Sequence, residues 1–167
     1  MSQFQQRLIG WLQILGGVAM IGGTAISVRM MHLLQTLLSP VEIVASLIGS
    51  VGFALLCVVA GYLLIRSQPA GRLFSVIAQA VQVLGIHLGS LNIQIFAGAQ
   101  LGITITGAQS RLAVGFGSHF GLFSGQGSMG WGLTLNMVPL IALYWLRKGP
   151  VHPSPVGEKS RSYADAV

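Results

Sequence analysis

Polar side chains within an otherwise apolar stretch are the groups in this chain that could do chemistry. The stretch runs from Arg72 to Phe96 and has no charged residue after Arg72. On a helix that turns about 100° per residue, its polar residues share an arc about 140° wide. Such groups avoid hydrocarbon, so we expect them, with Asn136 of a later span, to face protein or a small polar solute. This polar stripe consists of Ser75, Gln79, Gln82, His87, Ser90 and Asn136.

Histidine offers a second kind of chemistry, because neutral imidazole ligates haem iron and transition metals. His32, His87 and His119 are expected on one side of a membrane, which leaves a haem-binding or redox subunit as an alternative hypothesis. No two of them have ligand spacing within one element, and no carboxylate in a span could orient them. We therefore predict no metal site and no cofactor, and an interhelical hydrogen bond for His87.

Motifs of the common enzyme classes are missing from the sequence. The serines have no acid–base partner at a suggestive spacing, and the motif GxSxG does not occur. The glycine-rich run at 115–127 lacks the Lys-Ser/Thr of a phosphate loop. Basic residues do not cluster with aromatic ones, which argues against nucleic-acid binding. We predict a protein without catalytic residues.

The composition indicates a membrane protein. Only 7% of the 167 residues are charged and 53% are hydrophobic, whereas a soluble domain has about 25% charged residues. Cys57 is the single cysteine, so an intramolecular disulfide and a cysteine-type metal site are both excluded. The lipid bilayer is therefore the expected surroundings of this chain.

Hydrophobic runs predict an all-α membrane protein, a four-helix transmembrane bundle within a single domain at 1–148. Period-two alternation predicts a small extracytoplasmic β-hairpin between spans three and four, with its bulky face on the helix ends. A cleaved signal peptide is the competing interpretation of span one. The predicted spans are 8–28, 41–65, 73–91 and 129–146, the β-rich segment is 92–124, and a disordered cytoplasmic tail is 149–167.

Small residues recur on the predicted helix faces at the spacing that lets helices approach closely. The set is more than one compact bundle needs, which favours a non-enzymatic structural or interaction subunit that forms a homo-oligomer or joins a larger membrane complex. A channel or carrier for a small polar solute, using the polar stripe, is the alternative. The predicted packing residues are Ala19, Gly23, Ser46, Ser50, Gly85 and Gly89.

Charge distribution predicts the orientation. With four spans, seven basic residues lie on the side of both termini and only Arg29 and Arg111 on the other. The positive-inside rule then places both termini in the cytoplasm. The general plan is that of many small bacterial proteins of the plasma (inner) membrane, which is the expected location.

Overall fold

The computed structural model describes residues 1–34, 40–88, 91–106, 109–124 and 131–148, with some side chains within these ranges left undescribed. These residues form helices and one antiparallel sheet, so the chain is not the all-α protein that the hydrophobic runs predicted. The elements are α1 (Gln3–Leu34), α2 (Pro40–Ile65), α3 (Pro69–Val83), β1 (Leu84–Leu88), β2 (Leu91–Thr106), β3 (Gln109–Ser124), β4 (Gly132–Asn136) and α4 (Met137–Arg147).

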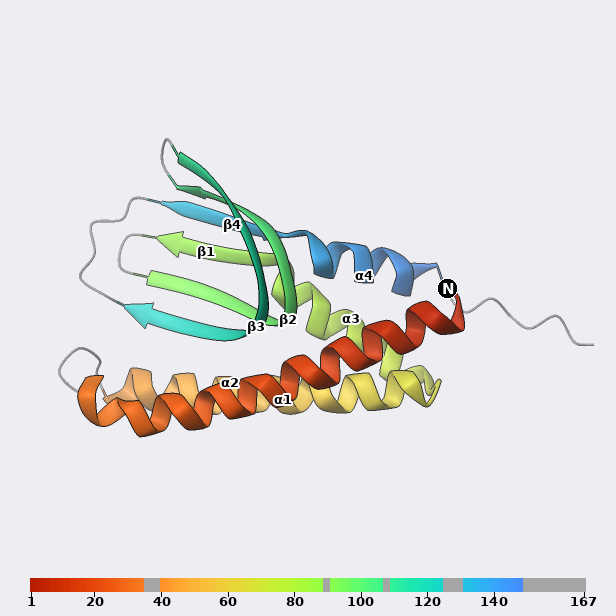
Figure 1. The fold of residues 1–167 in the computed structure, drawn as a ribbon, viewed down its shortest axis with the longest axis horizontal. Helices are drawn as coiled ribbons and strands as arrows, with labels where there is room; N and C mark the ends of the chain where they lie inside the picture. The colour runs from red at the N-terminus through yellow and green to blue at the C-terminus, as the bar shows by residue number, and fades with distance from the viewer. Residues whose placement is uncertain (35–39, 89–90, 107–108, 125–130, 149–167) are drawn as a thin grey trace, which may run out of the picture.

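α1 and α2 are long antiparallel helices that lie side by side along the whole molecule (Figure 1). Within them, Gln3–Ile26 and Ile43–Ile65 are long and apolar enough to cross a membrane, by length and composition. The predicted spans 8–28 and 41–65 lie within α1 and α2, respectively. They are the two such helices found among the described residues.

Glycine lets α1 and α2 come into close contact. A Cβ atom on Gly17 would lie 2.7 Å from the carbonyl oxygen of Ala54, so a larger residue at this position would force the helices apart. The hydroxyl groups of Thr24 and Ser50 are hydrogen-bonded further along the pair. These contacts fix the pair over much of its length.

The predicted third span, 73–91, is wrong. α3 ends at Val83, and Leu84 has the extended backbone angles φ −116° and ψ 130°. The chain continues directly as β1, because Leu84, Ile86 and Leu88 alternate with small or polar residues as a strand requires. Both periods fit this short segment, and pairing with the distant β4 decides for the strand.

The predicted fourth span, 129–146, is wrong as well. Its first part is the strand β4, and α4 has 11 residues, about 17 Å of helix, which is too short to cross a bilayer. Pro139 is the third residue of α4, where a missing N–H needs no partner, so the proline fits a helix start. The four-helix bundle is therefore replaced by a helix pair and a sheet.

The sheet curls because both ends of β2 reach the same neighbouring pair of strands. β1 pairs with the start of β2, β4 pairs with the end of β2, and β1 and β4 pair with each other. β3 lies along the other edge of β2 in continuous register. The hairpin bends where Gly98, with φ +99°, faces Gly117. Glycine is needed there, since other L-residues avoid this angle.

The molecule has two layers, one of which is helical throughout while the other combines the sheet with two helices (Figure 1). The α1–α2 pair forms one layer throughout. The sheet lies over the half where α1 ends, and α3 and α4 lie over the half where α1 begins (Figure 1). Gly16 of α1 touches the bend of β2, because a Cβ atom there would overlap the Ala97–Gly98 peptide.

Described strand segments of the sheet carry large apolar side chains outside and small or polar ones inside. We expected the bulky face of the 92–124 segment to lie on the helix ends, and over 101–106 and 109–115 the structure shows the reverse. The exposed apolar residues are Leu84, Ile86, Leu101, Ile103, Ile105, Leu112, Val114 and Leu133. The buried or half-buried inner residues are Gly85, Gly102, Thr104, Thr106, Thr134 and Asn136.

Candidate functional site

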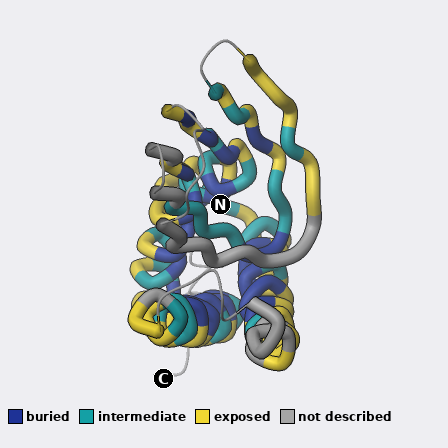
Figure 2. Tube along the Cα trace, turned by 90° about the vertical axis from the view of Figure 1, so that its left-hand side faces the viewer, coloured by how far each residue is buried: buried dark blue, intermediate teal, exposed yellow. Residues whose placement is uncertain are grey.

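Buried polar side chains from α1, α3 and β4 meet the sheet in the interior of the molecule, and we call this group the polar seam. Its members are all exposed by 6% or less. Dark blue segments in Figure 2 mark such buried positions on helices and strands. In an interior this apolar, each polar group needs a partner or raises the free energy of the fold. The polar seam consists of Gln13, Ser75, Gln79, Gln82 and Asn136.

Gln13 joins α1 to α3. The hydroxyl of Ser75 donates a hydrogen bond of 2.9 Å to Oε1 of Gln13. The Nε2 of Gln13 is buried and has no partner among the described residues. Exchanging the amide nitrogen and oxygen would leave the oxygen unpaired instead, because a hydroxyl can serve as donor or acceptor. One half of this buried amide is unsatisfied by the protein in either orientation.

Gln82 holds the bend of β2 against α3. Its Oε1 accepts a hydrogen bond of 2.7 Å from the backbone N–H of Ala97. Its Nε2 donates one of 3.0 Å to the carbonyl oxygen of Ala78, one turn earlier in α3. Both ends of the amide therefore have protein partners, which assigns Gln82 a structural role.

Asn136 stands at the junction of β4 and α4. Its Oδ1 accepts hydrogen bonds from the backbone N–H of Val138, at 3.2 Å, and of Leu101, at 3.3 Å. The first is the N-cap contact of α4, and the second ties that helix start to β2. The Nδ2 is buried without a partner among the described residues.

Gln79 lies at a cleft between α1, α3, α4 and β2. Its side chain is 6% exposed, and it makes no hydrogen bond with any described residue. The cleft has a cavity volume of about 20 Å³, which is room for about one water molecule. The lining residues are Ile9, Leu12, Gln79, Gln82, Ala97, Ala99, Val138, Pro139 and Ala142.

The predicted polar stripe is helical only in part. Three of its residues lie on α3, and the others lie outside that helix. Ser75, Gln79 and Gln82 lie on α3. Asn136, at the end of β4, caps α4, whose residues Val138 and Pro139 line the cleft together with Gln79 and Gln82. His87 belongs to β1, and its side chain is not described. Ser90 falls outside the described residues. The helical stripe therefore ends at Val83.

The histidine hypothesis stays a prediction. His32 lies in α1 and His119 in β3, and neither side chain is described. Within the described part of the chain, no group of three or more His, Cys, Asp or Glu residues is arranged to hold a metal ion.

The predicted packing residues have different fates. Ser50 is buried at the α1–α2 contact and Ser46 is half-buried. Ala19 and Gly23 face outward, and a Cβ on Gly23 would meet nothing within 4 Å. Gly85 lies in β1, so the predicted helical pair of Gly85 and Gly89 is wrong; Gly89 lies outside the described residues.

Gln13 was missed by the sequence reasoning, although a signal was present. It is a polar residue inside the charge-free run of the first span, and it lies one helical turn from Ile9. A glutamine in such a run needs a partner on another element, just as the glutamines of α3 do. The polar seam could have been extended to α1 on that ground.

The cleft offers hydrogen bonding and apolar contact, with no charged side chain and no nucleophile among its lining residues. No protein-family model, curated protein or solved structure matches the chain. The arrangement of the described residues is therefore the basis for inferring a function.

Proposed function

We propose that this chain is a multi-pass integral membrane protein without catalytic activity, which associates with further copies of itself in the bilayer. The observation that carries the proposal is the inverted distribution of side chains. Large apolar residues cover the outside of the helix pair and of the sheet, while amides and hydroxyls lie inside. Hydrocarbon as the surrounding solvent makes this distribution favourable.

The outer faces of α1 and α2 show the inversion most fully. Ile48 of α2, for example, is 70% exposed. In water, each such side chain that stays exposed forgoes about 1.5–3 kcal/mol of burial free energy. A continuous row of exposed apolar side chains therefore makes a soluble form unfavourable. The exposed large apolar residues include Trp11, Leu15, Val18 and Ile21 on α1 and Ile48, Val51, Leu55 and Val59 on α2.

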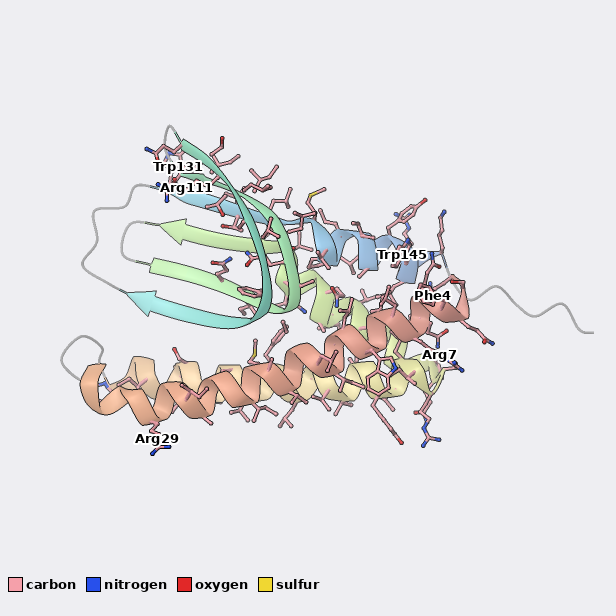
Figure 3. The ribbon with its side chains drawn as sticks, viewed as in Figure 1. Phe4, Arg7, Arg29, Arg111, Trp131 and Trp145 are labelled. Atoms are coloured by element: carbon pink, nitrogen blue, oxygen red, sulfur yellow. The ribbon has the colours of Figure 1, made fainter. Side chains whose placement is uncertain are left out.

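The distribution of charged and aromatic residues supports an orientation. Arg7 lies at the end of the molecule where the N-terminus is, whereas Arg29 and Arg111 lie toward the other end (Figure 3). The guanidinium of Arg72 donates a hydrogen bond of 3.0 Å to the carbonyl oxygen of Arg147, which brings further basic residues to the N-terminal end. By the positive-inside rule this end faces the cytoplasm, with both termini, in a bacterial plasma membrane.

Tryptophans mark both ends of the same axis. Trp145 and Phe4 lie toward the N-terminal end, whereas Trp131 and Arg111 lie toward the opposite end (Figure 3). Aromatic rings of this kind prefer the two membrane interfaces. Their positions agree with an axis that runs across the bilayer.

The open edge of the sheet supports self-association. In the described part of the sheet, the segment of β3 at 109–115 has β2 on one side and no strand on the other. On this segment, Leu112 is 70% exposed and Val114 is 73% exposed, and Figure 2 shows it as an exposed stretch. Backbone N–H and C=O groups in lipid need partners, and a second β3 supplies a matching edge.

Oxidative cross-linking in native membranes tests the proposal. One of the two variants Leu112→Cys and Val114→Cys should form disulfide-linked dimers. A two-fold pair of antiparallel edge strands places one of these positions opposite its own copy, with Cβ atoms about 4.5–5.5 Å apart. Leu133→Cys is the control, since Leu133 is also apolar and exposed, at 40%, but β4 has strands on both sides. Cys57 is fully buried, so the wild-type chain should give no dimer.

Three results would overturn the proposal. If neither β3 variant gives dimers, or if Leu133→Cys cross-links with equal yield, pairing through β3 is wrong. Release of the wild-type protein from membranes by alkaline carbonate would remove the membrane placement itself. Both measurements use the full chain.

A further inference from the structure

Basic side chains gather at the end of the molecule where the N-terminus lies, and we call this group the basic end. The guanidinium of Arg72, at the start of α3, donates a hydrogen bond of 3.0 Å to the backbone carbonyl oxygen of Arg147, at the end of α4. The start of α1 joins the end of α2, because the Nε2 of Gln6 donates a hydrogen bond of 2.6 Å to the carbonyl oxygen of Leu64. The basic end consists of Arg7, Arg66, Arg72, Arg147 and Lys148.

No acidic side chain of the described residues neutralises the basic end. Glu42 is the one acidic residue within the described ranges, and it lies in the first turn of α2, whereas Arg66 follows the last turn of the same helix. The segment 149–167 contains two acidic and two basic residues, so its side chains add no net charge. The basic end therefore attracts anions that come from outside the described protein.

Aromatic rings place this charge at the depth of lipid headgroups. The guanidinium of Arg66 lies 5.4 Å from the centroid of the Tyr62 ring. The Nζ of Lys148 lies 4.5 Å from the centroid of the Tyr144 ring. Both tyrosines are exposed, and Trp145 lies toward the same end of the molecule (Figure 3). Because tyrosine and tryptophan prefer the membrane interface, the anions available to these cations are the phosphates of lipid headgroups.

The chemistry of the basic end suits a phosphate group. A guanidinium can donate two parallel hydrogen bonds to phosphate oxygens, and an ammonium binds phosphate as a compact charge. Arg72 has five N–H donors, and its hydrogen bond to Arg147 uses one of them. That same bond holds the ends of α3 and α4 together, so cations from two elements can reach one headgroup.

We infer that the basic end binds the headgroup of an anionic phospholipid in the cytoplasmic leaflet, with Arg72, Arg147 and Lys148 as its main contacts. A zwitterionic headgroup binds more weakly, because its own ammonium group offsets the charge of its phosphate. The inference deepens the proposed function and rests on its membrane placement and orientation. The orientation depends only on the number of basic residues, whereas lipid binding depends on their proximity.

Native mass spectrometry of the full chain tests the lipid preference. The protein in mild detergent is incubated with equal amounts of phosphatidylglycerol and phosphatidylcholine that have the same acyl chains, and the wild type should retain mainly phosphatidylglycerol. Arg147→Gln combined with Lys148→Gln should lower the retained ratio of the two lipids about twenty-fivefold, about fivefold for each basic residue. Both substitutions keep the backbone carbonyl that accepts from Arg72, so the contact between α3 and α4 should survive.

A matched control removes two charges from the other end of the molecule. Arg29 and Arg111 are exposed and lie toward that end (Figure 3), so Arg29→Gln combined with Arg111→Gln should retain the lipids as the wild type does. Arg66→Gln changes one exposed side chain after α2 and should lower the ratio about fivefold. All variants should have the unfolding midpoint of the wild type in lipid-free detergent, which separates lost binding from lost folding.

Three results would overturn the inference. The wild type could retain both lipids equally, or the control pair could lose the preference as fully as the pair at the end of α4. A polyglutamate peptide at equal total charge could displace phosphatidylglycerol, in which case an acidic protein segment is the better partner. Each result leaves the proposed membrane placement standing when alkaline carbonate does not release the protein, so the two proposals fail separately.

Discussion

Gln79 and Gln82 lie one helical turn apart, and the structure predicts that the same substitution changes the free energy of unfolding differently at the two positions. Replacing Gln82 by Leu removes the acceptor of the Ala97 N–H at 2.7 Å. Ala97 is 8% exposed, so water cannot replace this acceptor. A buried N–H left without a partner costs about 1–3 kcal/mol, and we expect Gln82→Leu to lower the free energy of unfolding by that amount.

Gln79→Leu breaks no hydrogen bond within the described part of the protein and replaces a polar side chain at the cleft by an apolar one. Leucine has nearly the same volume, so the packing should survive. We expect the free energy of unfolding to stay the same or to rise by up to about 1 kcal/mol. The changes in the free energy of unfolding caused by the two variants should therefore differ by at least the contribution of the Gln82–Ala97 hydrogen bond.

Equilibrium unfolding in mixed detergent micelles measures both changes on one preparation, with Gln100→Leu as the control for a glutamine outside the seam. Equal destabilisation by Gln79→Leu and Gln82→Leu would show that the assignment of hydrogen bonds in the seam is wrong. A stable Gln82→Leu would show that the bend of β2 is held by other contacts.

Two more substitutions test the framework around the polar seam. Gly17→Ala should lower the free energy of unfolding by about 1–3 kcal/mol, because its Cβ would lie 2.7 Å from the carbonyl oxygen of Ala54. Gly22→Ala meets nothing within 4 Å and should leave stability unchanged or raise it by about 0.5–1 kcal/mol, so equal effects of the two variants would contradict the α1–α2 packing. Asn136→Ala should lower the thermal unfolding midpoint through a loss of about 1–2 kcal/mol of capping. Asn136→Ser keeps an N-cap oxygen and should retain most of that stability, and a midpoint as low as that of Asn136→Ala would argue against capping.

The sequence predicts α1 and α2 well, because each is a long, nearly charge-free apolar run that fits a helix and is too long for a single strand. The boundary after Val83 is a different case. His87 and Ser90 continue the helical stripe of α3, while Leu84 and Ile86 alternate as a strand would. Over so few residues both periods fit. The decision comes from pairing with β4, which lies more than forty residues away, and no local pattern reports that contact.

The candidate site was predictable to the extent that its residues share one element. The helical period predicts that Gln79 and Gln82 lie on one face of α3, but it does not predict their different roles. The role of Gln82 depends on the N–H of Ala97, which is positioned by the bend at Gly98. A positive φ at one glycine among the 23 of the chain leaves no mark in hydropathy or spacing.

Alternation along a strand defines two faces, but the surrounding solvent decides which face turns inward. In water the bulky face of β2 over 101–106 would be buried, and that was the expectation for the hairpin. The inner face here is the narrow one, since a Cβ on Gly102 would lie 2.8 Å from the carbonyl oxygen of Leu135. The hydroxyls of Thr104 and Thr134 are 2.9 Å apart on this same face. Small residues thus allow the strands to close over a polar interior, and the apolar side chains that remain outside need a lipid or protein neighbour. For a chain with the composition of a membrane protein, the better expectation is that the sheet, like the helices, turns its large apolar side chains outward and its small and polar residues inward.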